Sequence, residues 1–329
     1  MQIKTPILLL LLGLGTLASL TLALAIGSGS TGPAEALAAF TQQGSQAAQD
    51  IVFKLRLPRA LAAFGTGACL ALAGVLMQVL LRNPLADPYI LGTSGGAAVA
   101  ALTAMLLGAA GLLIDAAAFG GALASTFLVF GLARERGEWA PGRLLLTGVV
   151  IAAGWSALIS LLLATSPEAG LRGMLFWLMG DFAFAGSPVL VLTAALVATV
   201  LGTLGSRALN LLATGDQQAA LLGLPVAETR TVTYLAAAAM TSVAVTTAGT
   251  VGFIGLVVPH LLRLLGATNH RALIPGSALA GGTLLVIADT VARTLLAPRQ
   301  LPVGAITAVI GVPLFLLLLR QGPGRGRSA

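Results

Sequence analysis

Asp289 and Arg293 are the side chains best placed to do chemistry inside an apolar run of this sequence. They stand four residues apart in the run 272–296, so a helix would place them on one face. A carboxylate in a membrane-spanning helix is either a proton-coupling group or half of a neutralised ion pair. The pair, near the outer end of the helix, is the favoured interpretation, because a proton-driven transporter is expected to carry more buried ionisable groups.

A second candidate is the proline-rich segment RNPLADPYILG at residues 82–92. Pro84 and Pro88 cannot both lie within one regular helix, since each removes a backbone donor and disfavours helix in the residue before it. The chain must therefore turn between two apolar runs. Such a rigid turn is either a connector or the lining of a gate.

The third candidate, residues 214–230, reads TGDQQAALLGLPVAETR. Asp216 is predicted to cap a short helix, Gly223 to end it, and Pro225 to separate it from a second helical turn. A plain connection would need fewer residues. This amphipathic helix-turn-helix is therefore predicted to be a docking surface for a cytosolic partner, with an idle structured loop as the alternative.

The fourth candidate, residues 249–263, combines closely spaced glycines with Pro259 and His260. Glycines permit close backbone approach, and Pro259 is expected to interrupt the helix, as happens where a broken helix lines a cavity. His260 is either a ligand or proton relay, or a hydrogen-bonded structural residue. The structural role is the simpler interpretation.

The elements that position these residues are apolar throughout. Of the 329 residues, 57% are hydrophobic and 9% charged, which excludes a soluble domain and indicates a polytopic membrane protein. Residues 171–184 are expected to form a short helix at one face, and residues 27–49 an external loop. About ten membrane-spanning helices are predicted, at 7–26, 57–81, 91–107, 116–133, 143–164, 188–205, 230–249, 253–265, 272–296 and 302–320.

The basic residues predict the orientation, because cytoplasmic loops retain Lys and Arg. With the N-terminus inside, twelve of the 18 basic residues lie inside, and an even number of spans places both termini in the cytoplasm. The alternative is a cleaved signal peptide, with Lys4 before the apolar run and Ala23-Leu24-Ala25 as a cleavage site.

Several kinds of site are not indicated. The basic residues are dispersed, so no nucleic-acid partner is expected despite the formal charge of +7. Cys69 is the only cysteine and is expected to be an inert core residue, so neither a disulfide nor a metal site is predicted. The sequence lacks a phosphate-binding loop ending in Lys-Ser or Lys-Thr, so this chain is not expected to bind ATP or to be an enzyme.

Taken together, these stretches resemble the FecCD family, the permeases of ABC importers for iron-siderophores, haem and cobalamin. The resemblance runs over nearly the whole chain. It rests on LRLPR at 55–59, RNPLADPYILGTSGG at 82–96, RLLLTG at 143–148, LRGMLFWLMG at 171–180, LGLPV at 222–226, GTVGFIGLVVPHLLRLL at 249–265 and ADTVAR at 288–293.

The resemblance implies an all-α, type II ABC importer permease fold in a single domain, 1–329, with a short basic cytoplasmic tail at 320–329. It further implies a homodimer in the bacterial inner membrane, two cytosolic ATPase subunits that carry ATP and Mg, and a periplasmic binding protein. The implied site residues are Asn83 and Leu85 for the cytoplasmic gate; Asp216, Leu222, Gly223, Leu224 and Pro225 for coupling to the ATPase; and Arg56, Arg59 and Arg293 for docking of the binding protein.

The substrate is predicted from one residue. Arg172, near the outer mouth, suits carboxylates such as haem propionates, so haem or another iron chelate is the first expectation and cobalamin the alternative. An ion-coupled secondary transporter with Asp289 as coupling group is the alternative of another class. Residues 139–142 depart from cobalamin permeases, which place small hydroxyl residues there, and this puts a hydroxyl-lined gate in doubt.

Overall fold

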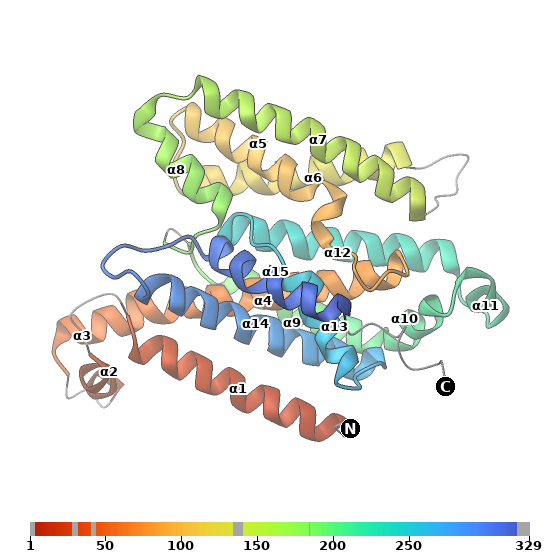
Figure 1. The fold of residues 1–329 in the computed structure, drawn as a ribbon, viewed down its shortest axis with the longest axis horizontal. Helices are drawn as coiled ribbons and strands as arrows, with labels where there is room; N and C mark the ends of the chain where they lie inside the picture. Colours follow the sequence, from red (N-terminus) through yellow and green to blue (C-terminus); the bar gives the residue numbers. More distant parts are fainter. Residues whose placement is uncertain (1–3, 28–31, 41–43, 134–140, 184, 321–329) are drawn as a thin grey trace.

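The computed structural model describes residues 4–27, 32–40, 44–133, 141–183 and 185–320 (Figure 1). Every regular element in these ranges is a helix. The first half of the chain forms α1 (Thr5–Ala25), α2 (Pro33–Phe40), α3 (Gln46–Asp50), a π-helical turn η1 (Ile51–Arg56), α4 (Leu57–Leu80), a 3-10 turn η2 (Pro88–Leu91), α5 (Thr93–Leu106), α6 (Leu112–Ala133) and α7 (Pro141–Thr165).

The second half continues the all-helical architecture. It forms α8 (Glu168–Met179), α9 (Val189–Leu204), α10 (Ser206–Ala213), α11 (Asp216–Leu221), α12 (Val226–Ala248), α13 (Ile254–Leu264), α14 (His270–Thr294) and α15 (Val303–Arg320). Six helical stretches of the described residues are long and apolar enough to cross a membrane, or seven if the bent pair α9–α10 counts as one span. Three shorter apolar helices, α5, α13 and α15, would have to cross as well for the count to reach ten, so that count stays a prediction.

The helix α4 runs through the centre of the molecule and is buried along most of its length. It packs against α14, α12, α9 and α13, while α5, α6 and α7 form a layer on the other side of α12 (Figure 1). Glycines permit these close approaches. A Cβ added at Gly74 would collide with the backbone of Gly255, and one added at Gly67 would collide with Gly281.

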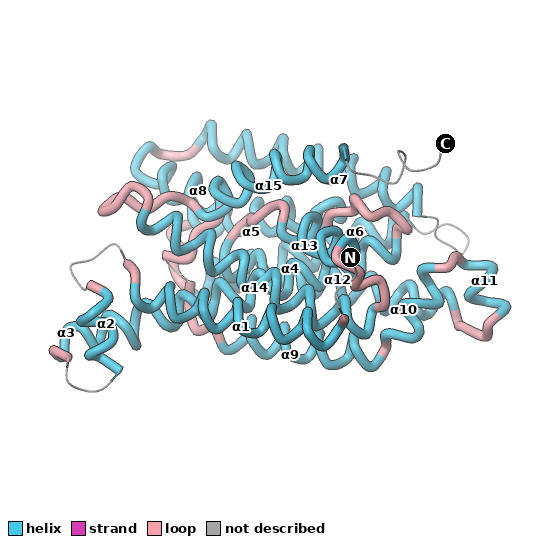
Figure 2. The backbone as a smooth tube through the Cα atoms, turned by 60° about the horizontal axis from the view of Figure 1, so that its bottom comes forward, coloured by secondary structure: helices cyan, strands magenta, loops and turns pink. Residues whose placement is uncertain are grey.

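The two ends of the molecule carry different features. One end, here called the α11 end, holds α10, α11, the start of α1 and the end of α15 (Figure 1). The opposite end, the α3 end, holds α2, α3 and the end of α1 (Figures 1 and 2). The start of α1 and the end of α15 therefore lie toward the same end of the molecule, and the cytoplasmic placement of both termini stays a prediction.

Three predicted elements differ from the structure. The external loop 27–49 contains α2 and α3, because Pro33 opens one helix and the Ser45 side chain accepts the Ala48 amide of the other at 3.2 Å. The span 188–205 continues past a 67° bend into α10. Pro259 does not interrupt α13, which continues to Leu264.

Candidate functional site

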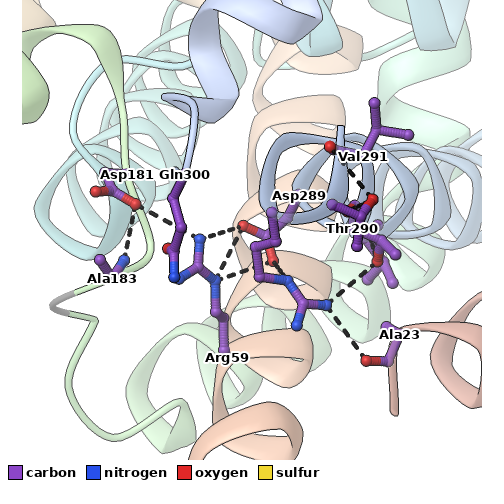
Figure 3. A network of polar contacts seen from close by, with 11 residues as sticks. Ala23, Arg59, Asp181, Ala183, Asp289, Thr290, Val291 and Gln300 are labelled. Carbon is purple, nitrogen blue, oxygen red and sulfur yellow. Dashed lines mark hydrogen bonds and ion pairs between the residues drawn. The ribbon is translucent and has the colours of Figure 1, made fainter. Parts of the chain in front are cut away.

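A buried ion-pair network lies at the α3 end, centred on Asp289 of α14 (Figure 3). The Arg59 guanidinium of α4 donates through Nε to both Asp289 carboxylate oxygens at 3.1 Å, and through Nη2 to Oδ1 at 2.9 Å. Its third nitrogen donates to Gln300 Oε1 at 2.9 Å. Because Asp289 is only 1% exposed, these bonds and the paired charge make its burial tolerable.

Arg293 completes this network from the same helix as Asp289. Its Nε lies 3.1 Å from Asp289 Oδ2, so the ion pair predicted from the four-residue spacing is confirmed. Its Nη2 donates to the Ala23 carbonyl at 3.3 Å. Arg56 donates to the Leu24 carbonyl at 2.8 Å and to that of Ala25 at 3.2 Å. Two arginines thus bind the last-turn carbonyls of α1, which a helix leaves without internal partners.

Asp181, in the connection between α8 and α9, lies at the edge of the network. Its Oδ1 is 3.6 Å from Arg59 Nη2. Burial raises the pKa of the Asp181 carboxyl above its usual value, and the Ala183 amide and the Arg59 charge oppose this shift. No local pattern predicts the contact between Asp181 and Arg59, because the two residues lie far apart in the chain.

The three arginines predicted to dock a binding protein therefore make internal contacts. Arg56 and Arg293 are each 4% exposed, and the Arg59 side chain is 12% exposed. Their docking role stays a prediction. The contacts of Arg56 and Arg293 also fasten the end of α1 to the rest of the fold.

A second charged cluster lies at the α11 end. Arg230, in the second turn of α12, donates to Asp216 Oδ2 at 2.7 Å, and Arg82 Nη2 lies 3.7 Å from the same oxygen. Asp216 is the first residue of α11, and Arg82 opens the proline-rich segment 82–92. One carboxylate therefore joins the predicted coupling helix to α12 and to the predicted gate segment.

This arrangement corrects two local predictions. Asp216 does not cap α11: the N-cap is Gly215, at φ 110°, and the Asp216 side chain turns to the arginines instead. Gly223 does end the helix, at φ 82°, in the left-handed region that favours glycine. The turn after Pro225 is not a separate helix but the start of α12. Leu221 and Leu222 are 88% and 64% exposed and form an apolar surface at the C-terminal end of α11.

The segment 82–92 is bent and fixed by its own side chains, as its prolines predict. Asn83 Oδ1 accepts the Leu85 amide at 2.9 Å, forming a tight turn. Asp87 Oδ1 accepts the Tyr89 amide at 2.8 Å and so caps η2. The Tyr89 hydroxyl donates to the Val251 carbonyl and accepts its amide, at 3.1 and 3.0 Å. The segment is thereby fastened to the connection between α12 and α13.

The other end of this segment is linked to α7. Ser125 of α6 donates to the Gly92 carbonyl at 2.8 Å, and the Trp155 indole of α7 donates to the Ser125 hydroxyl at 2.8 Å. Gly92 has φ 69°, a conformation suited to glycine, between η2 and α5. The roles of Asn83 and Leu85 as a gate stay predictions. Residues 134–140, which include two of the four residues of the departure at 139–142, lie outside the described residues.

The remaining candidates are placed as follows. The Arg172 guanidinium lies 5.6 Å from the Phe176 ring centroid on the exposed side of α8, within cation–π range. Cys69 is fully buried in α4, with its thiol 3.6 Å from the Val191 carbonyl. Within the part of the chain that the structure describes, no three metal-ligating side chains come together.

Comparison with known proteins places this geometry in a family. Residues 15–321 match the model of the FecCD transport family. A vitamin B12 import system permease protein, BtuC, from Escherichia coli O157:H7 is 44% identical over 276 residues, covering 82% of this chain and 84% of the relative. The BtuC of Serratia proteamaculans is 43% identical, covering 85% of each chain.

Solved structures agree on the fold. An inward-facing metal-chelate type ABC transporter matches with a TM-score of 0.84 at 31% identity, covering 97% of this chain and all of that one. PsaBC from Streptococcus pneumoniae matches with a TM-score of 0.56 at 16% identity, which supports the helical architecture alone.

Proposed function

Because this chain belongs to the FecCD transport family and is a permease of ABC importers, we propose that it moves cobalamin across the bacterial inner membrane, from periplasm to cytoplasm. The observation that carries this proposal is the 44% identity to a vitamin B12 permease over 82% of the chain. A haem or another iron chelate is the second candidate, favoured by the metal-chelate transporter that matches at 31% identity.

The sequence alone favours haem or another iron chelate over cobalamin, whereas the similarity to vitamin B12 permeases favours cobalamin. That order rested on Arg172, which is exposed on α8 and stacked on Phe176. A guanidinium in this position suits any anionic oxygen, whether a carboxylate of a chelate or the phosphate of cobalamin. Arg172 is therefore compatible with both candidates and does not discriminate between them.

The energy is proposed to come from two cytosolic ATPase subunits that dock at the α11 end, with ATP and Mg bound by those subunits. The exposed leucines Leu221 and Leu222 offer an apolar docking surface beside Gly223, Leu224 and Pro225. A movement of α11 would act on Asp216, and through its ion pairs on Arg230 and Arg82. The displacement would thus reach α12 and the gate segment together.

The assembly is proposed to be a homodimer with a periplasmic binding protein at the α3 end. The helix α7 faces outward along most of its length, which suits contact with a second permease. The start of α1 and the end of α15 both lie at the α11 end. Docking of ATPases there would therefore place both termini in the cytoplasm. Arg56, Arg59 and Arg293 would then lie at the periplasmic side and mainly influence the rate and register of docking.

An ion-coupled secondary transporter is a weaker proposal for this chain. Its coupling group would be Asp289, which must exchange a proton during transport. Asp289 is instead 1% exposed and paired with two arginines, Arg59 and Arg293, whose buried charges it balances.

The test is uptake into proteoliposomes that contain this chain with its ATPase and binding protein, offered cobalamin, haem and a ferric siderophore in parallel. ATP-dependent accumulation of cobalamin alone is the expected result. Accumulation of haem or the siderophore would replace the substrate and keep the ABC mechanism. Uptake that follows an imposed proton gradient without ATP would overturn the mechanism.

A further inference from the structure

A long apolar groove lies on the outer side of α12, between α12, α9 and α10. Its cavity measures about 480 Å³, within the size range of ligand sites. On α12 its wall is a stripe at helical spacing that includes Glu228, Val232, Ala236 and Met240. Twelve residues of helix span about 18 Å, so the groove runs lengthwise through roughly three turns.

The bend between α9 and α10 shapes the opposite wall. Val197, Leu201 and Gly205 line the groove from this side, and the 67° bend follows at Gly205. Figure 2 shows α9 on the side of the molecule away from α7. A second permease that docks on α7 would therefore leave this groove facing the bilayer.

The groove has the shape and polarity of one acyl chain. Its length is comparable with half the hydrocarbon thickness of a bilayer, about 15 Å. Its walls belong to α12, which is long and apolar enough to span a membrane, and to α9, which is so together with α10, so lipid would surround them in this permease family. An acyl chain in this groove would make packing contacts with its apolar walls.

The negative charge of Glu228, at one end of the groove, favours a lipid with a positively charged group in its headgroup. Among the described residues that line the groove, Glu228 alone is charged; it is exposed, at the α11 end of the groove. The ion pairs found between described residues do not include Glu228. A carboxylate in this position attracts an ammonium group and repels an anionic headgroup, and a primary ammonium, unlike a quaternary one, also donates hydrogen bonds to it.

We propose that this groove is a binding site for a phospholipid with an amine headgroup, phosphatidylethanolamine, whose acyl chain lies along α12 and whose ammonium group pairs with Glu228. The residues that line the groove include Pro225 and Thr229, at the start of α12. A bound lipid therefore fills the space behind the segment that the ATPase is proposed to move. This site does not depend on the identity of the transported substrate.

The experiment compares lipid retention by native mass spectrometry of the full-length chain in nanodiscs that contain equal amounts of phosphatidylethanolamine, phosphatidylglycerol and phosphatidylcholine with the same acyl chains. Wild-type protein is expected to retain phosphatidylethanolamine preferentially. Ala236→Phe fills the groove and should abolish that preference. Leu196→Phe is the control, because Leu196 is 66% exposed on α9 and does not line the groove.

Glu228→Gln tests the headgroup separately. It should reduce the preference for phosphatidylethanolamine about two- to fivefold, the effect of one exposed ion pair. Glu168→Gln, an exposed carboxylate on α8, is the matched control. Phosphatidylethanolamine with a photoreactive group on its acyl chain should crosslink to peptides of α9 and α12, and the crosslink should disappear in Ala236→Phe.

Three results would overturn the site. They are crosslinking spread evenly over the membrane-facing helices, equal retention of the three lipids by wild type, or the same loss in Leu196→Phe as in Ala236→Phe. These measurements need neither ATPase nor substrate, so their failure would leave the proposed transport function untouched, and a failed uptake assay would leave the lipid site untouched.

Discussion

Gln78 of α4 supplies the hydrogen bond that Pro259 of α13 cannot make. In a regular helix the Gly255 carbonyl accepts the amide of residue 259, which proline lacks. Gln78 Nε2 donates to that carbonyl at 3.3 Å and to the Leu256 carbonyl at 3.2 Å, and Gln78 Oε1 accepts from Arg263. This partner explains why α13 continues through its proline instead of breaking there.

We therefore expect Gln78→Leu to destabilise the protein by about 1–3 kcal/mol, because buried carbonyls and the Arg263 guanidinium lose partners. Thermal unfolding in detergent measures the change. Gln217→Leu, at an exposed position of α11, is the control and should shift the midpoint little. Equal midpoints for the two variants would show that α13 does not depend on Gln78.

Asp289→Asn should destabilise the protein by about 3–5 kcal/mol, since it leaves the buried charges of Arg59 and Arg293 without compensation. The yield of folded protein and its unfolding midpoint measure this loss. Asp50→Asn, whose carboxylate pairs with Lys54 at an exposed position, is the control and should be near neutral. An Asp289→Asn variant that folds normally yet has lost all uptake would favour proton coupling through this residue.

Asp216→Asn should uncouple ATP hydrolysis from transport. It weakens the ion pairs with Arg230 and Arg82, so α11 would move without displacing α12 and the gate segment. We expect uptake per ATP hydrolysed to fall on the order of tenfold, the effect of one charged hydrogen bond. Parallel measurement of hydrolysis and uptake in proteoliposomes checks this. Arg207→Gln, on the exposed side of α10, should change neither, and a normal ratio in Asp216→Asn would contradict the linkage.

Gly74→Ala should prevent correct packing of α4 against α13, because the added methyl group would collide with the Gly255 backbone, which cannot move aside as a side chain can. Loss of folded protein is the expected result, measured by size-exclusion chromatography after membrane extraction. Gly120→Ala has open space around its Cβ and should be neutral or slightly stabilising. Normal yields of both variants would contradict the close packing.

The sequence predicted those features that depend on local pattern. Apolar runs predicted most helices, the spacing of Asp289 and Arg293 predicted their ion pair, and Gly223 predicted the end of α11. Interactions between distant segments were missed. Such partners can be identified only once the fold is known. Examples are the ion pairs Arg59–Asp289 and Asp216–Arg230, and the hydrogen bond from Gln78 to the carbonyl that Pro259 leaves without a donor. Proline and capping rules describe a helix by itself, and they fail where a neighbouring helix supplies the missing partner.

Substrate identity could not be predicted from the residues, because one exposed arginine recognises any anionic oxygen. The family resemblance carried the general function, which the family match and the relatives support.

The burial of Cys69 has a practical consequence for following this transporter in motion. The native chain contains a single cysteine, and its side chain is fully enclosed between α4 and α9. Maleimide and methanethiosulfonate reagents should therefore leave the wild-type protein unlabelled. Fluorophores or spin labels can then be attached at chosen surface positions of α7 and α11 without first removing a native thiol, and distances between them can be recorded while ATP is turned over.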